Sequence, residues 1–367
     1  MGMASRASRF WISSRIHIDM SPVFDTDYPA DSVEFCPNPG FSNIFVCGTY
    51  KLVESPKPPA PGLPTPKAYR KGQCLVFRLN ESDDLSFDHV QTLDYPAIPD
   101  LKWCHGRAFP RPTLAIADSE GSVSLCQWDH DTGAMIPINS IQCADIDTLC
   151  LSLDWNNRLV DAKPLSLAVS LSNGELAYLQ VDSTGDLRVI GTWHSHDYEP
   201  WVTSWNYHDP NMLFSGGDDL TLKLWDIRNG FERPVMVNRK FEAGVTCIQS
   251  HLVDSDLVAV GSYDEKVRFF DTRNLLRPLD ELGVGGGAWR IKWHPSASRQ
   301  NELLIACMHD GFKVGRYSKD TPSSILSEFR EHESLAYGAD WSFSEGGEKT
   351  PIATCSFYDH KLHVWSA

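Results

Sequence analysis

Residues 213–228 read LFSGGDDLTLKLWDIR, and residues 257–273 read LVAVGSYDEKVRFFDTR. Each stretch is an apolar run, a turn of small and acidic residues, a second run of alternating apolar and polar residues, and an aromatic-Asp-x-Arg close. Alternation with a period of two predicts strands with one buried face, and the short polar turn predicts a hairpin. Trp225 and Phe270 hold the same place in the two copies, 45 residues apart.

Weaker copies of this hairpin occur along the rest of the chain, at 44–78, 114–129, 167–182, 303–317 and 352–365. Each hairpin follows a short apolar segment that can form an inner strand, at 32–37, 100–105, 150–155, 202–207, 245–250, 289–295 and 337–342. A four-stranded repeat of about 45 residues is typical of WD-repeat propellers. The sequence therefore predicts an all-β fold, a seven-bladed WD-repeat β-propeller.

The ends of the chain indicate how the ring closes. The last blade reaches only its third strand at Trp365, and we expect a strand within 16–28 to supply the fourth, which would remove a free sheet edge. The predicted organisation is an N-terminal extension at 1–19 and a single propeller over 20–367, with a Pro-rich insert at 54–72 in the first blade. Arg6, Arg9 and Arg15 in the extension indicate either a weak targeting peptide or an overlong start.

Composition narrows the function classes. The net charge is −15, from 33 basic and 48 acidic residues, which disfavours nucleic acid as a partner. No apolar stretch is long enough for a membrane span. The 10 cysteines are scattered without a C-x-x-C pair, so we expect reduced buried thiols in a cytoplasmic protein and no metal site. No Walker or dinucleotide-binding motif is present, so no cofactor is expected. The G-x-S-x-G motif of serine hydrolases is also absent. We expect a monomer.

One group of residues resembles a catalytic triad. His196, Ser215 and Asp219 precede Trp225, and this set is similar to the hydrogen-bonded tetrad that stabilises a WD-repeat blade. The spacing of Asp219 and Trp225 recurs for Asp264 with Phe270 and for Asp359 with Trp365. Because a catalytic site occurs once and a structural device repeats, the tetrad is predicted to be structural.

Ten short strings together carry a more specific resemblance. They are ADSVEFCP (30–37), VCGTY (46–50), LKWCH (101–105), LSLDW (151–155), SGGDD (215–219), GSYDE (261–265), GGAWRIKWHP (286–295), LIACMHDGFK (304–313), YGADWS (337–342) and ATCSFYDHKLHVW (353–365). In this order they resemble the diphthine methyl-ester hydrolase family, the WD-repeat proteins of the diphthamide pathway. The resemblance covers nearly the whole chain from Ala30 to Trp365.

That resemblance implies a specific reaction. The substrate would be translation elongation factor 2, whose modified histidine carries a trimethylammonium group and a methylated carboxylate. The enzyme would hydrolyse this methyl ester, and the freed carboxylate would then be amidated to give diphthamide.

An ester hydrolase without a serine elbow needs a base that activates water. His309 is the first candidate, because it lies in the predicted turn of a blade that lacks the residues of the structural tetrad. His360 and His105 follow as further candidates. Asp310 or Asp340 would orient the base. A cysteine nucleophile, Cys307 or Cys355, is the less favoured alternative, because both cysteines lie in apolar strands where a thiolate is disfavoured.

A trimethylammonium group predicts an aromatic box, since a quaternary cation is attracted to π faces and donates no hydrogen bonds. Candidates at turns and inner-strand starts of adjacent blades are Tyr263, Trp289, Tyr337 and Tyr358. Blade packing is the alternative role for these rings. Asp264 and Glu265 would add negative potential, and Arg290 would contact the carboxylate or pair with an acid.

Two readings without catalysis stay open. WDIR at 225–228 and FDTR at 270–273 resemble the short WD-x-R motif of substrate receptors for cullin ubiquitin ligases, and a trafficking adaptor would have the same kind of sequence. Alternatively, the propeller binds elongation factor 2 on behalf of another enzyme. Both readings predict binding without esterase activity.

Overall fold

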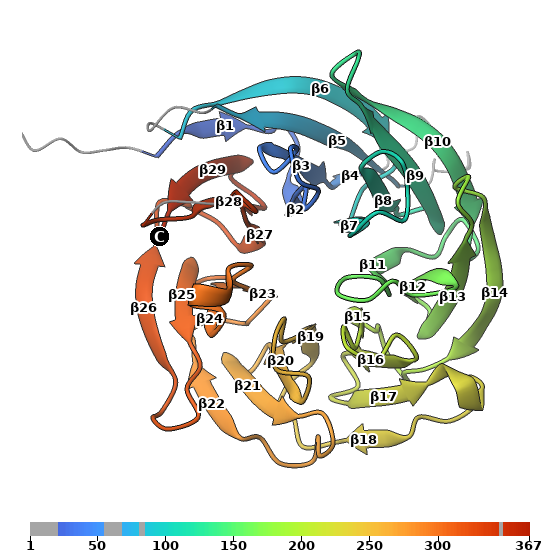
Figure 1. Ribbon diagram of the computed structural model, residues 1–367, viewed down its shortest axis with the longest axis vertical. Helices are drawn as coiled ribbons and strands as arrows, with labels where there is room; N and C mark the ends of the chain where they lie inside the picture. Colours follow the sequence, from blue (N-terminus) through green and yellow to red (C-terminus); the bar gives the residue numbers. More distant parts are fainter. Residues whose placement is uncertain (1–20, 55–67, 81–84, 345–347) are drawn as a thin grey trace, which may run out of the picture.

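Seven antiparallel sheets form a closed ring around a central axis (Figure 1). The computed structural model describes residues 21–54, 68–80, 85–344 and 348–367. In each sheet the innermost strand lies against the axis, and the strands paired with it in turn lie progressively further out. The predicted seven-bladed β-propeller is confirmed.

The blades follow one another along the chain. Blade one contains β2 (Ala30–Phe35), β3 (Ile44–Thr49), β4 (Lys51–Val53), β5 (Tyr69–Leu79) and β6 (Phe87–Tyr95). Blade two contains β7 (Asp100–Trp103), β8 (Thr113–Ala117), β9 (Ser122–Asp129) and β10 (Ala134–Gln142). Blade three contains β11 (Cys150–Trp155), β12 (Leu165–Leu171), β13 (Glu175–Val181) and β14 (Leu187–His194). Blade four contains β15 (Val202–Trp205), β16 (Met212–Gly216), β17 (Leu222–Asp226) and β18 (Met236–Asn238).

The second half of the ring repeats this order. Blade five contains β19 (Val245–Ser250), β20 (Leu257–Ser262), β21 (Lys266–Asp271) and β22 (Asp280–Gly283). Blade six contains β23 (Arg290–Trp293), β24 (Glu302–Ala306), β25 (Phe312–Arg316) and β26 (Ser324–Phe329). Blade seven contains β27 (Ala336–Trp341), β28 (Pro351–Ser356), β29 (Lys361–Ser366) and β1 (Val23–Asp25).

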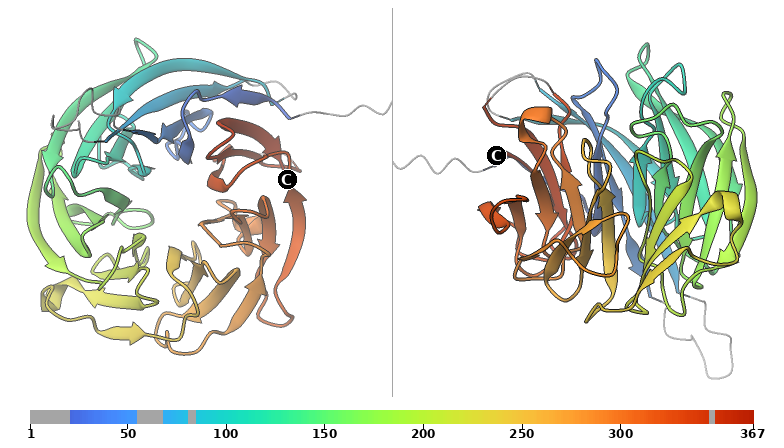
Figure 2. Two further views of the ribbon diagram at one scale, coloured as in Figure 1. Left: turned by 180° about the vertical axis from the view of Figure 1, so that it is seen from behind. Right: turned by 60° about the horizontal axis from the view of Figure 1, so that its bottom comes forward.

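The N-terminal strand closes the ring, as predicted. β1 pairs with β29 in antiparallel register, with Val23 opposite His363, and both ribbon views place the two strands side by side (Figure 2). Residues 1–19 and most of the Pro-rich insert lie outside the described residues. Residues 69–72, which the sequence assigned to that insert, instead extend β5 and pair partly with β4.

A repeated tryptophan joins neighbouring blades. Five inner strands end in a fully buried tryptophan whose indole N–H donates to a backbone carbonyl of the preceding inner strand; the pairs are Trp103 with Glu34, Trp155 with Lys102, Trp205 with Asp154, Trp293 with Gln249 and Trp341 with Lys292. Donor–acceptor distances are 2.9–3.3 Å. Each such bond is worth about 1 kcal/mol beyond the burial of the ring. These contacts fix the spacing of the inner strands around the channel.

The tetrad predicted from the sequence is present. His196 Nε2 lies 2.7 Å from Ser215 Oγ, His196 Nδ1 lies 2.9 Å from Asp219 Oδ1, and the Trp225 indole donates to Ser215 Oγ. Blade seven holds a second set, in which His332 contacts Thr354 and Ser356, Ser356 donates to Asp359, and Trp365 donates to Thr354. The third predicted copy differs, because Asp264 pairs with Arg268.

Two further sequence expectations concern cysteines and the membrane. All ten cysteines are buried and free. The described part of the chain contains no helix with the length and apolar character that a membrane crossing requires.

Candidate functional site

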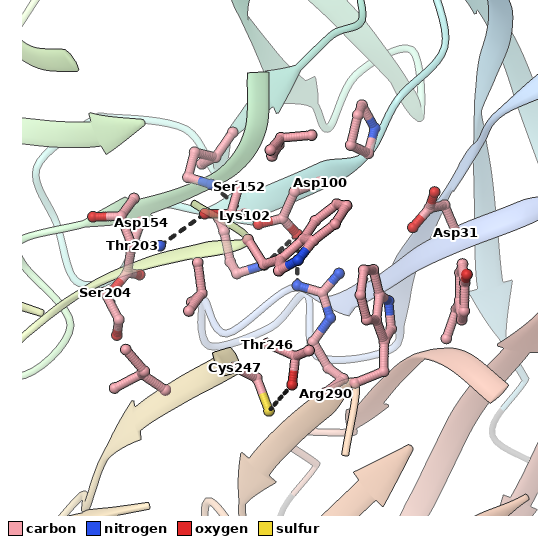
Figure 3. A pocket seen from close by; sticks show the side chains of 18 of the residues that line it. Asp31, Asp100, Lys102, Ser152, Asp154, Thr203, Ser204, Thr246, Cys247 and Arg290 are labelled. Atoms are coloured by element: carbon pink, nitrogen blue, oxygen red, sulfur yellow. Dashed lines mark hydrogen bonds and ion pairs between the residues drawn. The ribbon is translucent and has the colours of Figure 1, made fainter. Parts of the chain in front are cut away.

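A cavity of about 550 Å³ lies in the central channel. Residues from the inner strands of all seven blades line it, and Figure 3 shows the side chains of 18 of the lining residues. This volume is within the range that accommodates a small ligand or one modified side chain.

Strand register identifies one end of this channel as its mouth. Arg290 at the start of β23 pairs with Ala306 at the end of β24, and Ala336 at the start of β27 pairs with Ser356 at the end of β28. The starts of the inner strands and the turns that follow the second strands therefore lie at the same end of the ring. We call this the mouth end.

Six aromatic side chains form a continuous arc on the cavity wall at the mouth end. Neighbouring rings along the arc, in the order Trp201, Tyr263, Trp289, Tyr337, Phe357 and Tyr50, have centroids 4.8–6.3 Å apart. Trp289 and Tyr337 are stacked at 4.8 Å with an interplanar angle of 25°. Such an arc presents π faces and ring edges together, as a pocket for a quaternary cation does. The arc spans five blades, so it exists only in the folded ring.

A network of buried charges lies below this aromatic arc. Arg290 donates to Asp100 Oδ1 at 2.9 Å, and Lys102 contacts the same oxygen at 2.6 Å (Figure 3). Lys102 also lies 3.0 Å from Glu34, which in turn pairs with Lys292. Acids and bases alternate here, so each buried charge has an opposite neighbour.

Arg290 belongs to blade six and Asp100 to blade two, so their ion pair crosses the channel. Burial lowers, and Asp100 raises, the pKa of the Arg290 guanidinium, with a net upward shift. Arg290 therefore stays cationic under all working conditions. It gives the cavity a fixed positive group beside the aromatic arc.

Several acids of the channel hold the backbone of the neighbouring blade. Asp100 Oδ2 accepts Leu153 N–H at 3.1 Å, Asp154 Oδ2 accepts Trp205 N–H at 2.9 Å, and Asp340 Oδ2 accepts Phe35 N–H at 2.8 Å. Burial raises the pKa of Asp154 and of Asp340 to about 6. These carboxyl groups therefore have a structural role, which is to join neighbouring blades of the ring.

Asp31 differs from those acids. It lies at the second position of β2, lines the cavity, and is 7% exposed. Burial raises the pKa of Asp31 to about 8, while Arg290 acts to lower it. In the close view Asp31 lies on the opposite side of Arg290 from Asp154 (Figure 3).

The structure brings together four of the residues predicted to bind substrate. Tyr263, Trp289, Tyr337 and Arg290 all line the central cavity. The two roles proposed for Arg290 are compatible, because it pairs with Asp100 and still borders the cavity. Tyr358 lies elsewhere: it is 70% exposed and lines a separate hollow of about 410 Å³.

His309 is exposed in the turn between β24 and β25, at the mouth end, and lines that separate hollow with Tyr358. The adjacent Asp310 is bound by Lys313 at 2.5 Å and Arg330 at 2.6 Å, and Lys313 holds its pKa below the usual range. His360 occupies the β28–β29 turn with φ of 56°. Of the described residues that line the central cavity, none is a histidine.

The other predicted site residues do not line the central cavity. His105 follows β7 at the far end, near Phe343, where burial holds its pKa well below the usual range. Asp340 pairs with Lys292 at 3.5 Å. Asp264 is bound by Arg268, and Glu265 is exposed in a turn with φ of 67°. Burial strongly raises the pKa of Cys307, which disfavours its thiolate; Cys355 is also buried.

Sequence reasoning missed much of the cavity wall, including Asp31, Tyr50, Asp100, Lys102, Trp201 and Phe357. One signal for them was available. The inner-strand segments DLKW and WRIKW carry charges between apolar residues, and the innermost strand of a propeller has only the channel to receive such charges.

Comparisons with known proteins agree with this fold. Residues 187–226 and 235–271 match the family model "WD domain, G-beta repeat". The structure is similar to a chain of the solved "Crystal Structure of Mitotic Checkpoint Complex", with a TM-score of 0.68, 16% sequence identity, and coverage of 100% of this chain and 97% of that one. At this identity the likeness shows the fold alone.

Curated relatives match over nearly the full length. "Diphthine methyltransferase" of Mus musculus is 36% identical, over 94% of this chain and 73% of that protein. The Schizosaccharomyces pombe protein of the same name is 33% identical, over 93% of this chain and 95% of that protein. "Diphthine methyltransferase homolog" of Dictyostelium discoideum is 33% identical, over 92% and 96%. The chain belongs to the diphthine methyltransferase family of WD-repeat propellers, as the resemblance in its sequence indicated.

Proposed function

We propose that this protein hydrolyses the methyl ester of methylated diphthine on translation elongation factor 2, releasing methanol and leaving the carboxylate for amidation. Membership of the diphthine methyltransferase family supports a role in diphthamide biosynthesis. The proposal goes beyond this role by naming ester hydrolysis as the reaction and elongation factor 2 as the substrate.

The observation that carries the proposal is the aromatic arc above a charged cavity. The substrate side chain combines a trimethylammonium group, which favours π faces, with an ester whose carbonyl oxygen becomes negative during attack by water. Trp289 and Tyr337 supply stacked rings, and Arg290, the next residue after Trp289, supplies a cation. The two chemical groups of the substrate thus meet two different parts of one cavity.

The position of this cavity suits a substrate that is itself a protein. The arc lies at the mouth end, so a modified side chain on a loop of elongation factor 2 can enter the channel while the rest of the factor stays outside the ring. Tyr358 and His309, exposed at the same end, are then candidates for contact with the factor itself.

A scaffold function is the alternative. Arg228 and Arg273, the arginines of the two WD-x-R motifs, are 56% and 70% exposed, and each pairs with the aspartate two residues before it, Asp226 and Asp271. Their exposure fits recognition by an adaptor protein, and their pairing fits a local structural role equally well.

The test uses the purified full chain and elongation factor 2 bearing the methylated intermediate. Mass spectrometry of the modified peptide should show loss of the mass of one CH₂ group, together with release of one methanol. If the peptide stays intact while the factor still binds, the hydrolase proposal fails and the scaffold alternative replaces it.

A further inference from the structure

Asp31 is the buried acid of the cavity whose structural role is least defined. Asp100, Asp154 and Asp340 each accept a backbone N–H from another blade, and Glu34 pairs with two lysines. Among the residues that the structure describes, no group donates a hydrogen bond to the Asp31 carboxyl. A buried carboxyl without such a bond is costly to keep, and this one faces the cavity rather than the packed interior.

The groups around Asp31 come from several elements. Arg290 on β23 and Asp100 on β7 act on it electrostatically, in opposite directions. Asp31 in turn helps to raise the pKa of three tyrosines of the arc, Tyr50, Tyr263 and Tyr337, although burial is the larger cause for each.

Asp31 also acts on the Cys47 thiol of β3, and Arg70 of β5 lines the same cavity. Burial is the main cause that raises the pKa of the Cys47 thiol, with a smaller effect of Asp31, and Arg70 donates to the Tyr50 hydroxyl at 2.6 Å. Asp31 therefore shares the cavity with the aromatic arc and with Arg290, the cation that acts on it most strongly among the described residues.

We infer that Asp31 is the general base of the proposed hydrolysis and that Arg290, held by Asp100, stabilises the oxyanion. This assignment rests on the proposed function and names the catalytic residues of that same cavity. A trimethylammonium group bound at the arc favours the ionised form of Asp31, so binding of the correct substrate prepares the base.

The reaction balances without a further reactant. Asp31 takes a proton from water as the water oxygen bonds to the ester carbonyl carbon, and the carbonyl electron pair moves to oxygen, near Arg290. The tetrahedral intermediate then re-forms the C=O bond and expels the methoxy group, which takes the proton back from Asp31. The products are the carboxylic acid, which ionises to the carboxylate, and methanol.

The experiment compares three variants with the wild type. Asp31→Asn keeps the shape and removes the base, Asp31→Glu keeps a base in a displaced position, and Asp320→Asn, on an exposed loop, is the matched control. Asp31→Asn should fold, because the carboxyl has no described hydrogen bond to lose. Thermal melts and tetramethylammonium titration by tryptophan fluorescence check the fold and the cation site independently of turnover.

We expect Asp31→Asn to lower kcat by about 100-fold or more, the usual contribution of a general base, while the Kd for tetramethylammonium changes by less than about 10-fold, as expected when the arc supplies most of the binding. Asp31→Glu should recover part of kcat, and Asp320→Asn should match the wild type. The wild-type kcat/KM should rise with pH and level off above the pKa of about 8 of the free enzyme's Asp31.

Two results would overturn the assignment. One is an Asp31→Asn variant whose kcat is retained while only KM and the tetramethylammonium Kd increase, because Asp31 would then be a counter-charge for the cation. The other is an Asp31→Asn variant with the wild-type pH profile. If the wild type itself leaves the ester intact, the proposed function fails instead, so the two failures are distinguishable.

Discussion

Arg290 of blade six donates a hydrogen bond to Asp100 of blade two, and this 2.9 Å contact crosses the central channel. Asp100 is fully buried and also holds Lys102 and the backbone N–H of Leu153. One carboxyl group thus connects three blades directly below the aromatic arc. The ring geometry and the charge of the cavity depend on the same residue.

This arrangement predicts unequal costs for removing the two partners. Asp100→Asn removes the carboxylate paired with Arg290, leaves Lys102 with Glu34 alone, and should destabilise the protein by about 3–5 kcal/mol. Arg290→Gln leaves Asp100 with two other donors and should cost about 1–2 kcal/mol. Urea unfolding followed by tryptophan fluorescence measures both values. Equal costs would mean that the cross-channel pair does not organise the ring.

The aromatic arc predicts a measurable affinity for a simple quaternary cation. Trp289→Leu should weaken tetramethylammonium binding by about 3- to 30-fold, corresponding to about 0.5–2 kcal/mol of cation–π attraction. Tyr198→Leu, a change at an exposed tyrosine that does not line the cavity, is the control and should have no effect. Isothermal titration calorimetry gives both constants. An unchanged tetramethylammonium affinity in Trp289→Leu would show that the cation does not bind at the arc.

Asp31 predicts a pH-dependent stability. Its folded pKa of about 8 lies above its ordinary value of 3.8, so the folded protein binds the additional proton between these values and loses stability as pH rises through them. Asp31→Asn removes this titration and should melt at a higher temperature than the wild type at pH 9. At pH 4 to 5 the difference should shrink. A melting difference that is the same at both pH values would contradict a raised pKa.

The histidines provide a test of location. His309 and His360 lie in turns and do not line the cavity, so His309→Ala and His360→Ala should each retain kcat within about 3-fold, well short of the 100-fold or more expected for loss of a general base. Their KM for elongation factor 2 can rise, because both turns lie at the mouth end. A loss of kcat by more than 100-fold in His309→Ala would instead identify His309 as the general base, as the sequence analysis predicted.

The ring was predictable because its signals are local and repeated. The hairpins at 213–228 and 257–273 show strand alternation, turn chemistry and the 45-residue interval within a few residues of each other, and the weaker copies are recognised by comparison. The unpaired third strand at Trp365 predicted the closure by an N-terminal strand, and β1 confirms it.

The site was only partly predictable, because radial position is a property of the closed ring. The sequence predicts at which end of a blade a turn lies. It therefore placed Tyr263, Trp289 and Tyr337 correctly at the mouth end. It does not give the distance from the axis, and so His309 and Tyr358 were grouped with them although they line a separate hollow. Asp31 and Asp100 look alike on inner strands, and only the pairing of blades separates a carboxyl that holds a neighbour from one that does not.

The central claim is that this cavity activates water against the ester carbonyl, and isotopic labelling tests it most directly. Turnover of the methylated intermediate in H₂¹⁸O should place one ¹⁸O atom in the carboxylate of the peptide and none in the methanol, because the bond between the acyl carbon and the methoxy oxygen breaks. Methanol that carries ¹⁸O would show that the methyl group was transferred to water instead. That result, or an ester that stays intact, would contradict the account.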